Sequence, residues 1–363
     1  MHIAHITSVH PQNDNRIFYK ECVTLANEGY KTTLIVAGAE NKESSGVSII
    51  GYPKAKGGRL KRIFKTSLFD MIRACKKVDA DIYHFHDPEL IFTGLYLKLK
   101  GKKVIYDIHE NIPADILSKP YIKSKILKQV ISKIFNIFEK NIIKFFNAIV
   151  TARPDITKRL KHHNIITLRN FPILSDFSKT IEIEVNKEKP AIIFVGGMTQ
   201  IRGINKLIDA FEDLNEYELW LLGPITEEKL KSRIDSGCKN VKYFGVVEAY
   251  EVFSYIQKAD IGIVTFLYDL NHIETLATKP FEYMACGKPM IMSNFNYWKD
   301  TFRNSSLYVD ANNSEDIAKT IKSLINNKAL LHDMGILNKK LSQNEYNWEK
   351  ESQKLLKLYK ELY

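Results

Sequence analysis

Two glutamates and a lysine stand at spacings that could serve a sugar and a phosphate. Glu274 and Glu282 are eight positions apart, and Lys279 lies between them at the start of a short helix-forming run. A helix N-terminus offers unpaired N–H groups and the positive end of the helix dipole, so a phosphate binds there readily. Carboxylates accept hydrogen bonds from sugar hydroxyls. The spacing alone is equally compatible with a solvated helix face.

The residues around these three favour the first interpretation. Thr278-Lys-Pro-Phe-Glu-Tyr-Met-Ala-Cys-Gly-Lys-Pro-Met-Ile resembles the donor-site signature of retaining glycosyltransferases of family 4. In that family two glutamates, separated by seven residues, flank the nucleotide-sugar. The resemblance implies that Lys279 binds the diphosphate, Glu282 the ribose, and Glu274 with nearby backbone N–H groups the hexose.

A glycine-rich turn follows an apolar segment in Phe194-Val-Gly-Gly-Met-Thr-Gln-Ile-Arg-Gly. Gly196 and Gly197 let the backbone approach a ligand closely, and Arg202 stands at the entrance of the next helix. The spacing is not that of a dinucleotide-binding fingerprint. The turn resembles the family loop that cradles the donor diphosphate, where Arg202 and Lys279 would neutralise the leaving group. Many relatives have an arginine where this chain has Gly197.

A candidate site for the nucleotide base lies in Tyr243-Phe-Gly-Val, at the end of a predicted strand. The segment resembles the place where the base packs in the family, which makes Phe244 a candidate donor-binding residue. A core aromatic pair explains the same residues equally well.

Three polar loops of the first half follow predicted strands. The candidates on them are Asp14, Arg16, His86, Asp87 and His109. A cluster of histidines and acids could bind a metal or transfer protons, although satisfied polar groups are the commoner explanation. The resemblance assigns these loops to the acceptor and implies that His109 contacts the transferred sugar near its 6-hydroxyl.

The elements that position these residues alternate in type, which predicts parallel sheets built of βα units. The expected strands of the first half are residues 2–7, 32–37, 47–52, 81–86, 103–108, 147–152 and 165–168. Those of the second half are residues 191–196, 217–222, 241–245, 261–265, 289–293 and 306–309. The first helix is expected over residues 16–28, with Gly29 as its C-cap.

The chain length of 363 residues suits two domains. We expect an acceptor-binding domain over residues 1–180 and a nucleotide-sugar-binding domain over residues 181–345, with a linker at residues 173–190. The family resemblance implies the GT-B fold, an α/β architecture of two Rossmann-like, doubly wound parallel-sheet domains facing a central cleft. It also implies that a last helix, residues 346–363, crosses back to the first domain.

Charge is unevenly distributed. Residues 1–180 hold 30 Lys and Arg against 16 Asp and Glu, whereas residues 181–363 hold 23 against 26. The basic half indicates an anionic partner such as a membrane surface.

Residues 121–146 are expected to form a basic amphipathic helix with Ile126, Val130, Ile134, Ile137 and Phe138 on one side. This pattern suits a membrane interface or a helix that covers a sheet. Nucleic acid is disfavoured because no recognition motif is present.

Cofactor signals are weak. Cys22, Cys75, Cys238 and Cys286 lie far apart without metal-ligand spacing, so reduced thiols and no metal are expected. The pair Asp79 and Asp81 precedes its strand and is therefore a structural feature. No apolar run is long enough to span a membrane, and the N-terminus starts directly with a strand, which predicts a cytoplasmic protein.

The family resemblance implies a retaining, metal-independent glycosyltransferase with no cofactor. It would move a hexose-type sugar from a nucleoside-diphosphate donor to a lipid-linked glycan in bacterial polysaccharide synthesis (O-antigen, capsule or cell wall), at the inner face of the cytoplasmic membrane. Alternatives are a nucleotide-sugar 2-epimerase of the same fold and a non-catalytic protein that binds the membrane surface.

Overall fold

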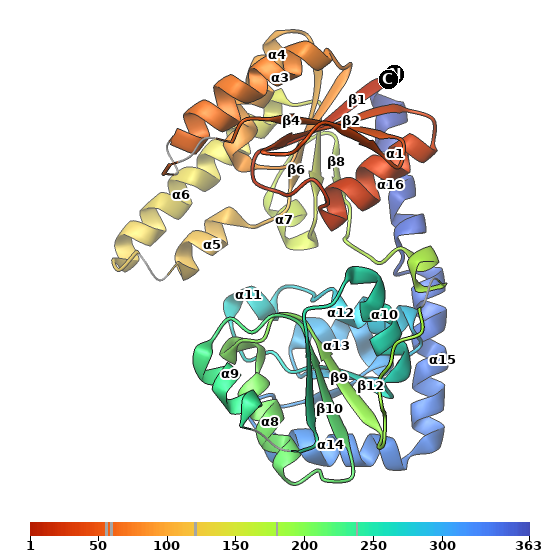
Figure 1. Cartoon of the computed structure of the whole chain (residues 1–363). Coiled ribbons are helices and arrows are strands. Elements are labelled where there is room, and N and C mark those ends of the chain that lie inside the picture. Colours follow the sequence, from red (N-terminus) through yellow and green to blue (C-terminus); the bar gives the residue numbers. More distant parts are fainter. Residues whose placement is uncertain (55–56, 59–60, 120–121, 179–180, 237–238) are drawn as a thin grey trace. The chain divides into compact units, whose positions relative to one another are not determined.

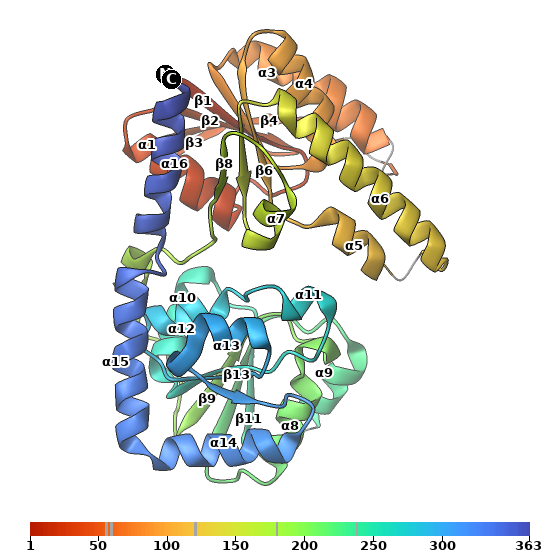
Figure 2. The same cartoon turned by 180° about the vertical axis from the view of Figure 1, so that it is seen from behind.

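The alternation of apolar segments and helices produces two parallel sheets. The computed structural model describes residues 1–54, 57–58, 61–119, 122–178, 181–236 and 239–363, so Cys238 and part of the predicted linker lie outside the described residues. The chain forms two compact units (Figures 1 and 2): Met1–Asn170 with Glu349–Tyr363, and Phe171–Trp348. The first unit therefore ends before the predicted linker, and the chain returns to it at Glu349.

The described part of the first unit contains an eight-stranded sheet of order β3-β4-β2-β1-β5-β6-β7-β8. Its strands are β1 (His2–Thr7), β2 (Lys31–Ala37), β3 (Lys42–Ser44), β4 (Val47–Tyr52), β5 (Ile82–Phe85), β6 (Lys103–Ile108), β7 (Ala148–Thr151) and β8 (Ile165–Thr167). All pair in parallel except β3, which runs antiparallel to β4. Every predicted strand is present to within one residue at each end. The unpredicted β3 has no apolar residue.

The helical segments of the first unit are η1 (Asn15–Cys22), α1 (Val23–Asn27), η2 (Arg62–Asp70), α3 (Met71–Val78), η3 (Pro88–Leu90), α4 (Ile91–Leu99), α5 (Ile112–Ser118), α6 (Lys125–Ile142), η4 (Ile143–Phe145), α7 (Pro154–Arg159) and α16 (Trp348–Leu362). The helix predicted over residues 16–28 is present as η1 and α1, which together span residues 15–27, and η1 is a π-helix.

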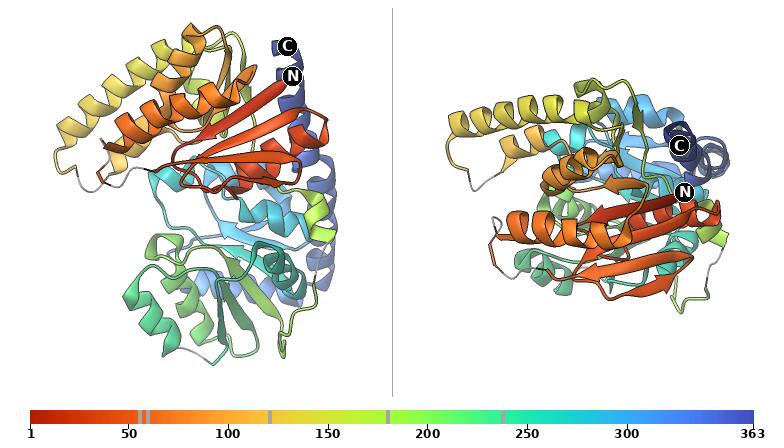
Figure 3. Two further views of the ribbon diagram at one scale, coloured as in Figure 1. Left: turned by 45° about the horizontal axis from the view of Figure 1, so that its top comes forward. Right: turned by 90° about the horizontal axis from the view of Figure 1, so that it is seen from above.

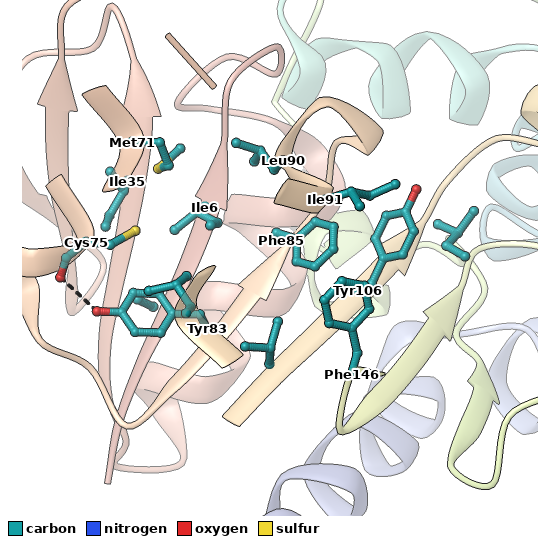
Figure 4. Close-up of a cluster of buried hydrophobic side chains, with 14 of the residues drawn as sticks. Ile6, Ile35, Met71, Cys75, Tyr83, Phe85, Leu90, Ile91, Tyr106 and Phe146 are labelled. Atoms are coloured by element: carbon teal, nitrogen blue, oxygen red, sulfur yellow. Dashed lines mark hydrogen bonds between the residues drawn. The ribbon is translucent and has the colours of Figure 1, made fainter. Parts of the chain in front are cut away.

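One face of this sheet carries an apolar core (Figure 4). Phe85 stacks on Tyr106 with ring centroids 4.4 Å apart, and Tyr83 donates a hydrogen bond to the carbonyl of Cys75 at 2.8 Å. Gly94 of α4 lies so close that a Cβ there would be 2.7 Å from the Phe85 ring. The core therefore depends on close approach of α4 to the sheet.

Side chains alternate along each strand, so the opposite face carries a second set of residues. Leu34 of β2 and Val47 of β4 form an apolar cluster there with Phe18 of η1. The central strands carry polar residues on this face. His5 of β1, His84 of β5 and Asp107 of β6 point to this face and are buried. It is covered by the η1–α1 segment and by α16 (Figure 3), whose Tyr359 hydroxyl lies 2.8 Å from His84 Nδ1 and 3.1 Å from His5 Nε2. The last helix therefore packs on the first unit, as the family resemblance implied.

The described part of the second unit contains a six-stranded sheet of order β11-β10-β9-β12-β13-β14, paired in parallel throughout. Its strands are β9 (Ala191–Val195), β10 (Glu218–Leu222), β11 (Val241–Gly245), β12 (Ile261–Val264), β13 (Met290–Ser293) and β14 (Leu307–Val309). All were predicted to within one residue at each end.

The helical segments of this unit flank the sheet. They are η5 (Leu174–Ser178), η6 (Gln200–Arg202), α8 (Ile204–Glu212), α9 (Glu228–Asp235), α10 (Ala249–Lys258), α11 (Leu270–Ile273), α12 (Lys279–Ala285), α13 (Asn296–Phe302), η7 (Arg303–Ser305), α14 (Ser314–Asn326) and α15 (Lys328–Asn344). Buried apolar clusters lie on both faces.

Each sheet contains a point where the strand order reverses. In the first unit this is between β1 and β5, and in the second between β9 and β12. Connections leave such neighbouring strands in opposite directions, so a crevice opens at their carboxyl ends, where doubly wound sheets bind their ligands. Most of the predicted site residues follow one of these four strands.

Candidate active site

The loops after β9 and β12 form the candidate donor site of the second unit. Gly196, Gly197 and Arg202 follow β9, whereas Glu274 and Lys279 follow β12. The backbone N–H of Leu267 donates to the carbonyl of Ile201 at 2.9 Å and ties the two loops together. The sheet order therefore brings both predicted donor loops to one edge.

Glycines allow these loops to meet. Gly203 has φ +73°, and a Cβ there would lie 1.8 Å from the carbonyl oxygen of Thr265. A Cβ on Gly223 would lie 2.3 Å from the Gly196 carbonyl oxygen. The buried hydroxyls of Thr199 and Thr265 have no hydrogen-bond partner within the described ranges. Such unpaired hydroxyls favour a polar ligand at this position.

Arg202 is a half-buried cation without a counter-ion. Its Nη1 donates to the carbonyl of Gly197 at 3.0 Å, and its guanidinium carbon lies 5.4 Å from the centroid of the Phe266 ring. No carboxylate of the described part of the chain pairs with it. Burial lowers the pKa of Arg202 because the charged form loses solvation. An anion at this loop would restore that lost stabilisation.

Lys279 begins α12 and is paired with Glu282. Its Nζ lies 2.8 Å from Oε1 and 2.6 Å from Oε2 of the carboxylate. The helix starts with Pro280 close behind, as expected for a first turn. The two predicted ligand-binding residues therefore form an ion pair with each other.

Glu274 lies at a cavity of about 610 Å³ in the second unit. The cavity is lined by Phe266, Tyr268, Ile273, Glu274, Ser293, Asn294, Phe295, Asn296, Tyr297, Asp310, Ala311 and Asn312. The exposed carboxylate of Glu274 has no hydrogen-bond or ion-pair partner among the residues described. It is therefore available to a ligand, as are the side-chain amides of the asparagines on the cavity wall.

The side chain of Phe244 packs against the hydrophobic core of the second unit. Its ring lies 5.5 Å from Trp220 and 4.9 Å from Tyr255, measured between centroids. The neighbouring Tyr243 is exposed and donates a hydrogen bond to the Gly223 carbonyl at 3.0 Å. The stacking surface open to a base on this strand is therefore Tyr243, which the sequence did not single out.

The candidate acceptor site of the first unit lies on the loops after β1 and β5. Asp14 accepts hydrogen bonds from the N–H groups of Arg16 and Ile17 and so caps η1. Burial opposes ionisation of Asp14, but the hydrogen bonds from His10 and these N–H groups outweigh it and lower its pKa. The His10 ring lies 3.3 Å from Asp14 and 3.4 Å from Asp87.

Asp87 joins the two loops. Its Oδ2 accepts from the Thr7 hydroxyl at 2.8 Å and from the N–H groups of Ser8 and Val9 at 2.6 and 3.2 Å. The carboxylate is buried but still reaches the pocket described below. Its main role in the fold is to fix the loop that carries His10.

Arg16 is buried, with 5% of its surface exposed. It binds Asp107 through two hydrogen bonds of 3.1 Å and donates to the Leu168 carbonyl at 2.7 Å. Burial raises the pKa of Glu21, as does the neighbouring Asp107, whereas Arg16 and His109 keep the pKa of Asp107 low despite its burial. Arg16 therefore holds an ionised Asp107 and stands behind the surface that an acceptor could touch.

Histidines continue this network outward. His86 Nε2 lies 2.9 Å from His5 Nδ1, and His86 Nδ1 lies 3.2 Å from His109 Nε2. Burial lowers the pKa of His86 to about 4, so its ring is neutral at pH 7. His109 also lies 3.0 Å from Asp107 Oδ2 and is partly exposed. Asp107 thus fixes the orientation of His109, which is the solvent-accessible histidine of this hydrogen-bonded network.

A pocket of about 250 Å³ opens at these residues. It is lined by Val9, His10, Arg62, His86, Asp87, Pro88, Glu89, Tyr106, Ile108, His109, Glu110 and Ile112. The structure therefore brings His86, Asp87 and His109 to one pocket and places Asp14 and Arg16 beneath it. His10 and the buried pair His5 and Glu21 were not among the predicted candidates. Only His10 had a sequence signal, since it follows a strand in a polar loop.

Among the residues that the structure describes, two groups of side chains could geometrically hold a metal ion: His5, Glu21, His84 and His86; and His86, Asp107 and His109. In the second group, Asp107 Oδ2 already accepts a hydrogen bond from Arg16 Nε. A guanidinium at that distance repels a cation.

The two aspartates that precede β5 have other partners. Asp79 pairs with Lys102, and Asp81 accepts a hydrogen bond from the N–H of His2. These contacts give the aspartates structural roles.

The apolar side of α6 is exposed. Ile126 and Ile134 expose 74% and 62% of their surface, and Val130, Ile137 and Phe138 are also exposed. Figures 1 and 2 show α6 running outward from the sheet with α5 beside it. Near its end the helix packs on the sheet: Glu139 is buried, with its carboxylate 3.5 Å from the Tyr106 hydroxyl of β6, and Ile142 packs against the apolar core. The helix therefore covers part of the sheet while much of its apolar side is exposed. No described helix is long and apolar enough to cross a bilayer.

Comparison with known families accounts for most of the chain. The model of group 1 glycosyl transferases matches residues 177–348, and that of glycosyltransferase family 4 matches residues 15–169. Both halves of the chain are therefore similar to glycosyltransferases, and the structure has the GT-B fold. The two models divide close to the boundary between the two units.

The individual relatives share only low sequence identity with this chain. An uncharacterized glycosyltransferase of Methanocaldococcus jannaschii is 27% identical over 237 residues, which is 61% of this chain and 65% of that protein. An uncharacterized 41.2 kDa protein in the cps region of Klebsiella pneumoniae is 23% identical over 235 residues, 62% of this chain and 63% of that protein. The matched stretch thus spans less than two thirds of either relative.

Solved structures share the fold over the full length. Sucrose-phosphate synthase from Thermosynechococcus elongatus superposes with a TM-score of 0.78 at 16% identity, covering 99% of this chain and 98% of that one. Anabaena HepE, solved with UDP and glucose, has a TM-score of 0.71 at 12% identity, covering 99% of each chain. At these identities the likeness establishes the fold alone.

Proposed function

We propose that the protein is a retaining, metal-independent hexosyltransferase that uses a nucleoside-diphosphate sugar. Arg202 carries this proposal, because it is a half-buried cation in a glycine-lined loop at a strand-order reversal and has no counter-ion in the described part of the chain. A diphosphate supplies the missing anion and accepts several hydrogen bonds from a guanidinium. The presence of UDP and glucose in the structure of Anabaena HepE supports the same ligand class here.

The proposed donor contacts follow from this anchor. Arg202 and Lys279 bind the diphosphate and stabilise it as it leaves, while Glu282 binds the ribose and Glu274 the hexose. Fixed cations then take the role that Mg²⁺ has in other transferases. His109, oriented by Asp107, contacts the sugar near its 6-hydroxyl.

The proposed acceptor is the hydroxyl of a lipid-linked glycan in bacterial polysaccharide synthesis. The name of the Klebsiella relative, a protein in the cps region, supports a capsule pathway. The exposed apolar residues of α6, next to Lys125, Lys128 and Lys133, support peripheral binding to an anionic membrane.

The donor part is tested by thermal unfolding with UDP-, GDP-, ADP- and TDP-sugars, each with and without EDTA. A bound nucleotide at 100 times its dissociation constant adds about 2.7 kcal/mol to the free energy of unfolding. Stabilisation by one nucleotide class that EDTA leaves unchanged is expected. No stabilisation by any of them, or stabilisation that EDTA removes, would contradict the metal-free donor site.

The membrane part is tested by sedimentation with vesicles of phosphatidylglycerol and phosphatidylcholine. Ile134→Asp should reduce binding by about tenfold or more, because a charge replaces an inserted apolar side chain. Leu99→Asp is the matched control, since Leu99 is 86% exposed on α4. Equal loss in both variants would show that α6 is not the membrane-binding element.

A further inference from the structure

A second cavity of the first unit has a different chemistry from the histidine pocket. It has a volume of about 560 Å³ and is lined by Ile63, Pro88, Glu89, Phe92, Glu110, Ile112, Asp115, Ile116, Lys119, Ile122, Ile131, Phe135 and Phe138. Nine of these side chains are apolar, and we call this cavity the α5–α6 groove. Phe92 and Phe138 face each other across it with ring centroids 6.2 Å apart.

The groove and the histidine pocket adjoin each other. Pro88, Glu89, Glu110 and Ile112 line both of them. One molecule can therefore contact both cavities. The two cavities together form one site with a polar end and an apolar end, the shape that an amphiphile requires.

Four charged side chains line the groove. Glu89, which is held by Arg62, and Glu110 also line the histidine pocket, whereas Asp115 and Lys119 line the groove alone. The rest of the lining, which includes Ile116, Ile131 and Phe138, is hydrocarbon. A neutral chain of CH₂ or isoprene units fits this part of the groove, whereas a chain of charged groups would lose its solvation.

The groove also borders the exposed apolar side of α6. Ile131, Phe135 and Phe138 of this helix line the groove, while Ile126 and Ile134 of the same helix are exposed. If α6 lies in a membrane interface, the groove opens beside the lipid phase. This arrangement gives a chain a path from the bilayer to the histidine pocket.

We propose that the α5–α6 groove binds the hydrocarbon chain of the acceptor lipid while the sugar end of the same molecule enters the pocket of His10, His86 and His109. This inference rests on the proposed function, because it assumes a lipid-linked acceptor. It assigns the groove one occupant, a single hydrocarbon chain, and explains why an apolar cavity adjoins a polar one.

The test measures binding of methyl, hexyl, heptyl and octyl β-glucoside by calorimetry, each below its micelle-forming concentration. The head group is constant, so any difference comes from the chain. Each buried CH₂ should tighten binding about fourfold, equivalent to about 0.8 kcal/mol. Equal affinities across the series would overturn the proposal.

Variants locate the binding. Phe92→Asp and Phe138→Asp place a charge in the groove at positions that are already exposed, and each should weaken octyl glucoside binding at least tenfold. Ile126→Asp, on the same α6 but outside the groove, and Leu99→Asp should bind as the wild type does. Unchanged affinity in both groove variants would place the chain elsewhere and overturn the proposal.

Two other outcomes are decisive. If the groove is an interface between two copies of the chain, sedimentation will show a dimer that Phe92→Asp dissociates, and chain length will not matter. Stabilisation by a nucleotide-sugar is measured separately on the same protein. Nucleotide binding without chain-length dependence would retain the donor site and reject the groove, whereas failure of nucleotide binding would reject the proposed function itself.

Discussion

Lys279 and Glu282 form an ion pair across one turn of α12, with Nζ within 2.8 Å of both carboxylate oxygens. The proposed function gives each of them a separate ligand group. In the proposed complex the diphosphate therefore shares Lys279 with Glu282. A partly exposed pair of this spacing adds little to stability.

The first prediction concerns these two residues. Lys279→Met should lower kcat/KM by about 100-fold or more, since it removes a cation that stabilises the leaving diphosphate. Its free energy of unfolding should change by less than about 0.5 kcal/mol. Kinetic assays and urea denaturation followed by tryptophan fluorescence measure the two effects.

Glu282→Gln is the companion variant. It frees Lys279 while removing the carboxylate from the ribose site, so donor KM should rise more than kcat falls. Full activity in Lys279→Met or in Glu282→Gln would reject the donor-site assignment. A large loss of stability in either would point to a structural role for the pair.

The second prediction concerns Arg202. Arg202→Met removes a half-buried charge that no described carboxylate compensates, so the free protein should be at least as stable as the wild type. The stabilisation by a nucleotide-sugar should disappear. Arg202→Lys keeps the charge but not the planar fork, so part of the stabilisation should remain. Thermal unfolding with and without the nucleotide-sugar measures both; equal ligand shifts in the wild type and Arg202→Met would contradict the role of this residue.

The strands were predictable because each is a short apolar run between helical segments. Parallel strands place their carboxyl ends at one edge of the sheet, so the polar loops after β1, β5, β9 and β12 could be assigned to two sites from sequence order. The resemblance of residues 278–291 to a family signature made the fold predictable as well. For α6, the sequence was compatible both with an exposed apolar face and with a helix that covers the sheet.

The features of the site that the sequence did not predict depend on the direction of side chains and on contacts between distant segments. Arg16 follows Asp14 in a polar loop, yet η1 turns it inward onto Asp107, where it is buried. His5 lies within an apolar strand and gives no signal until β1 pairs with β5. Phe244 and Tyr243 are neighbours, and only the strand register shows that Tyr243 is the exposed one.

The third prediction concerns the contact between the two donor loops. Gly203→Ala should destabilise the protein by about 3 kcal/mol or more, because the new Cβ would lie 1.8 Å from the Thr265 carbonyl oxygen at φ +73°. Gly101→Ala is the control, since Gly101 has φ +79° but no atom within 4 Å of the added Cβ. It should cost about 1 to 2 kcal/mol.

Tryptophan fluorescence during urea denaturation suits the Gly203 variant, because Trp220 and Trp298 are both buried in the second unit. For the Gly101 variant, which lies in the first unit, circular dichroism is the appropriate signal. Equal losses at the two glycines would mean that the left-handed backbone alone, and not the approach to Thr265, sets the cost.

The last prediction concerns acid sensitivity of the first unit. Burial lowers the pKa of His86 to about 4, whereas an unfolded chain has the ordinary value of 6.5. Between these two values the unfolded chain binds more protons than the folded one, so folding is favoured at higher pH and weakens as the pH falls from 6.5 to 4. His86 should contribute a slope of up to about 1.4 kcal/mol per pH unit in this window. The buried Glu21, whose pKa is raised, contributes with the opposite sign.

A difference measurement isolates His86 from Glu21 and the other histidines. His86→Gln keeps a polar side chain but cannot titrate, so its stability should fall less steeply than that of the wild type between pH 6.5 and 4. Hydrogen exchange of β1 and β5 at matched pH measures this difference, and exchange of the second unit provides the internal control. Parallel slopes for the two proteins would show that His86 is not held neutral by burial.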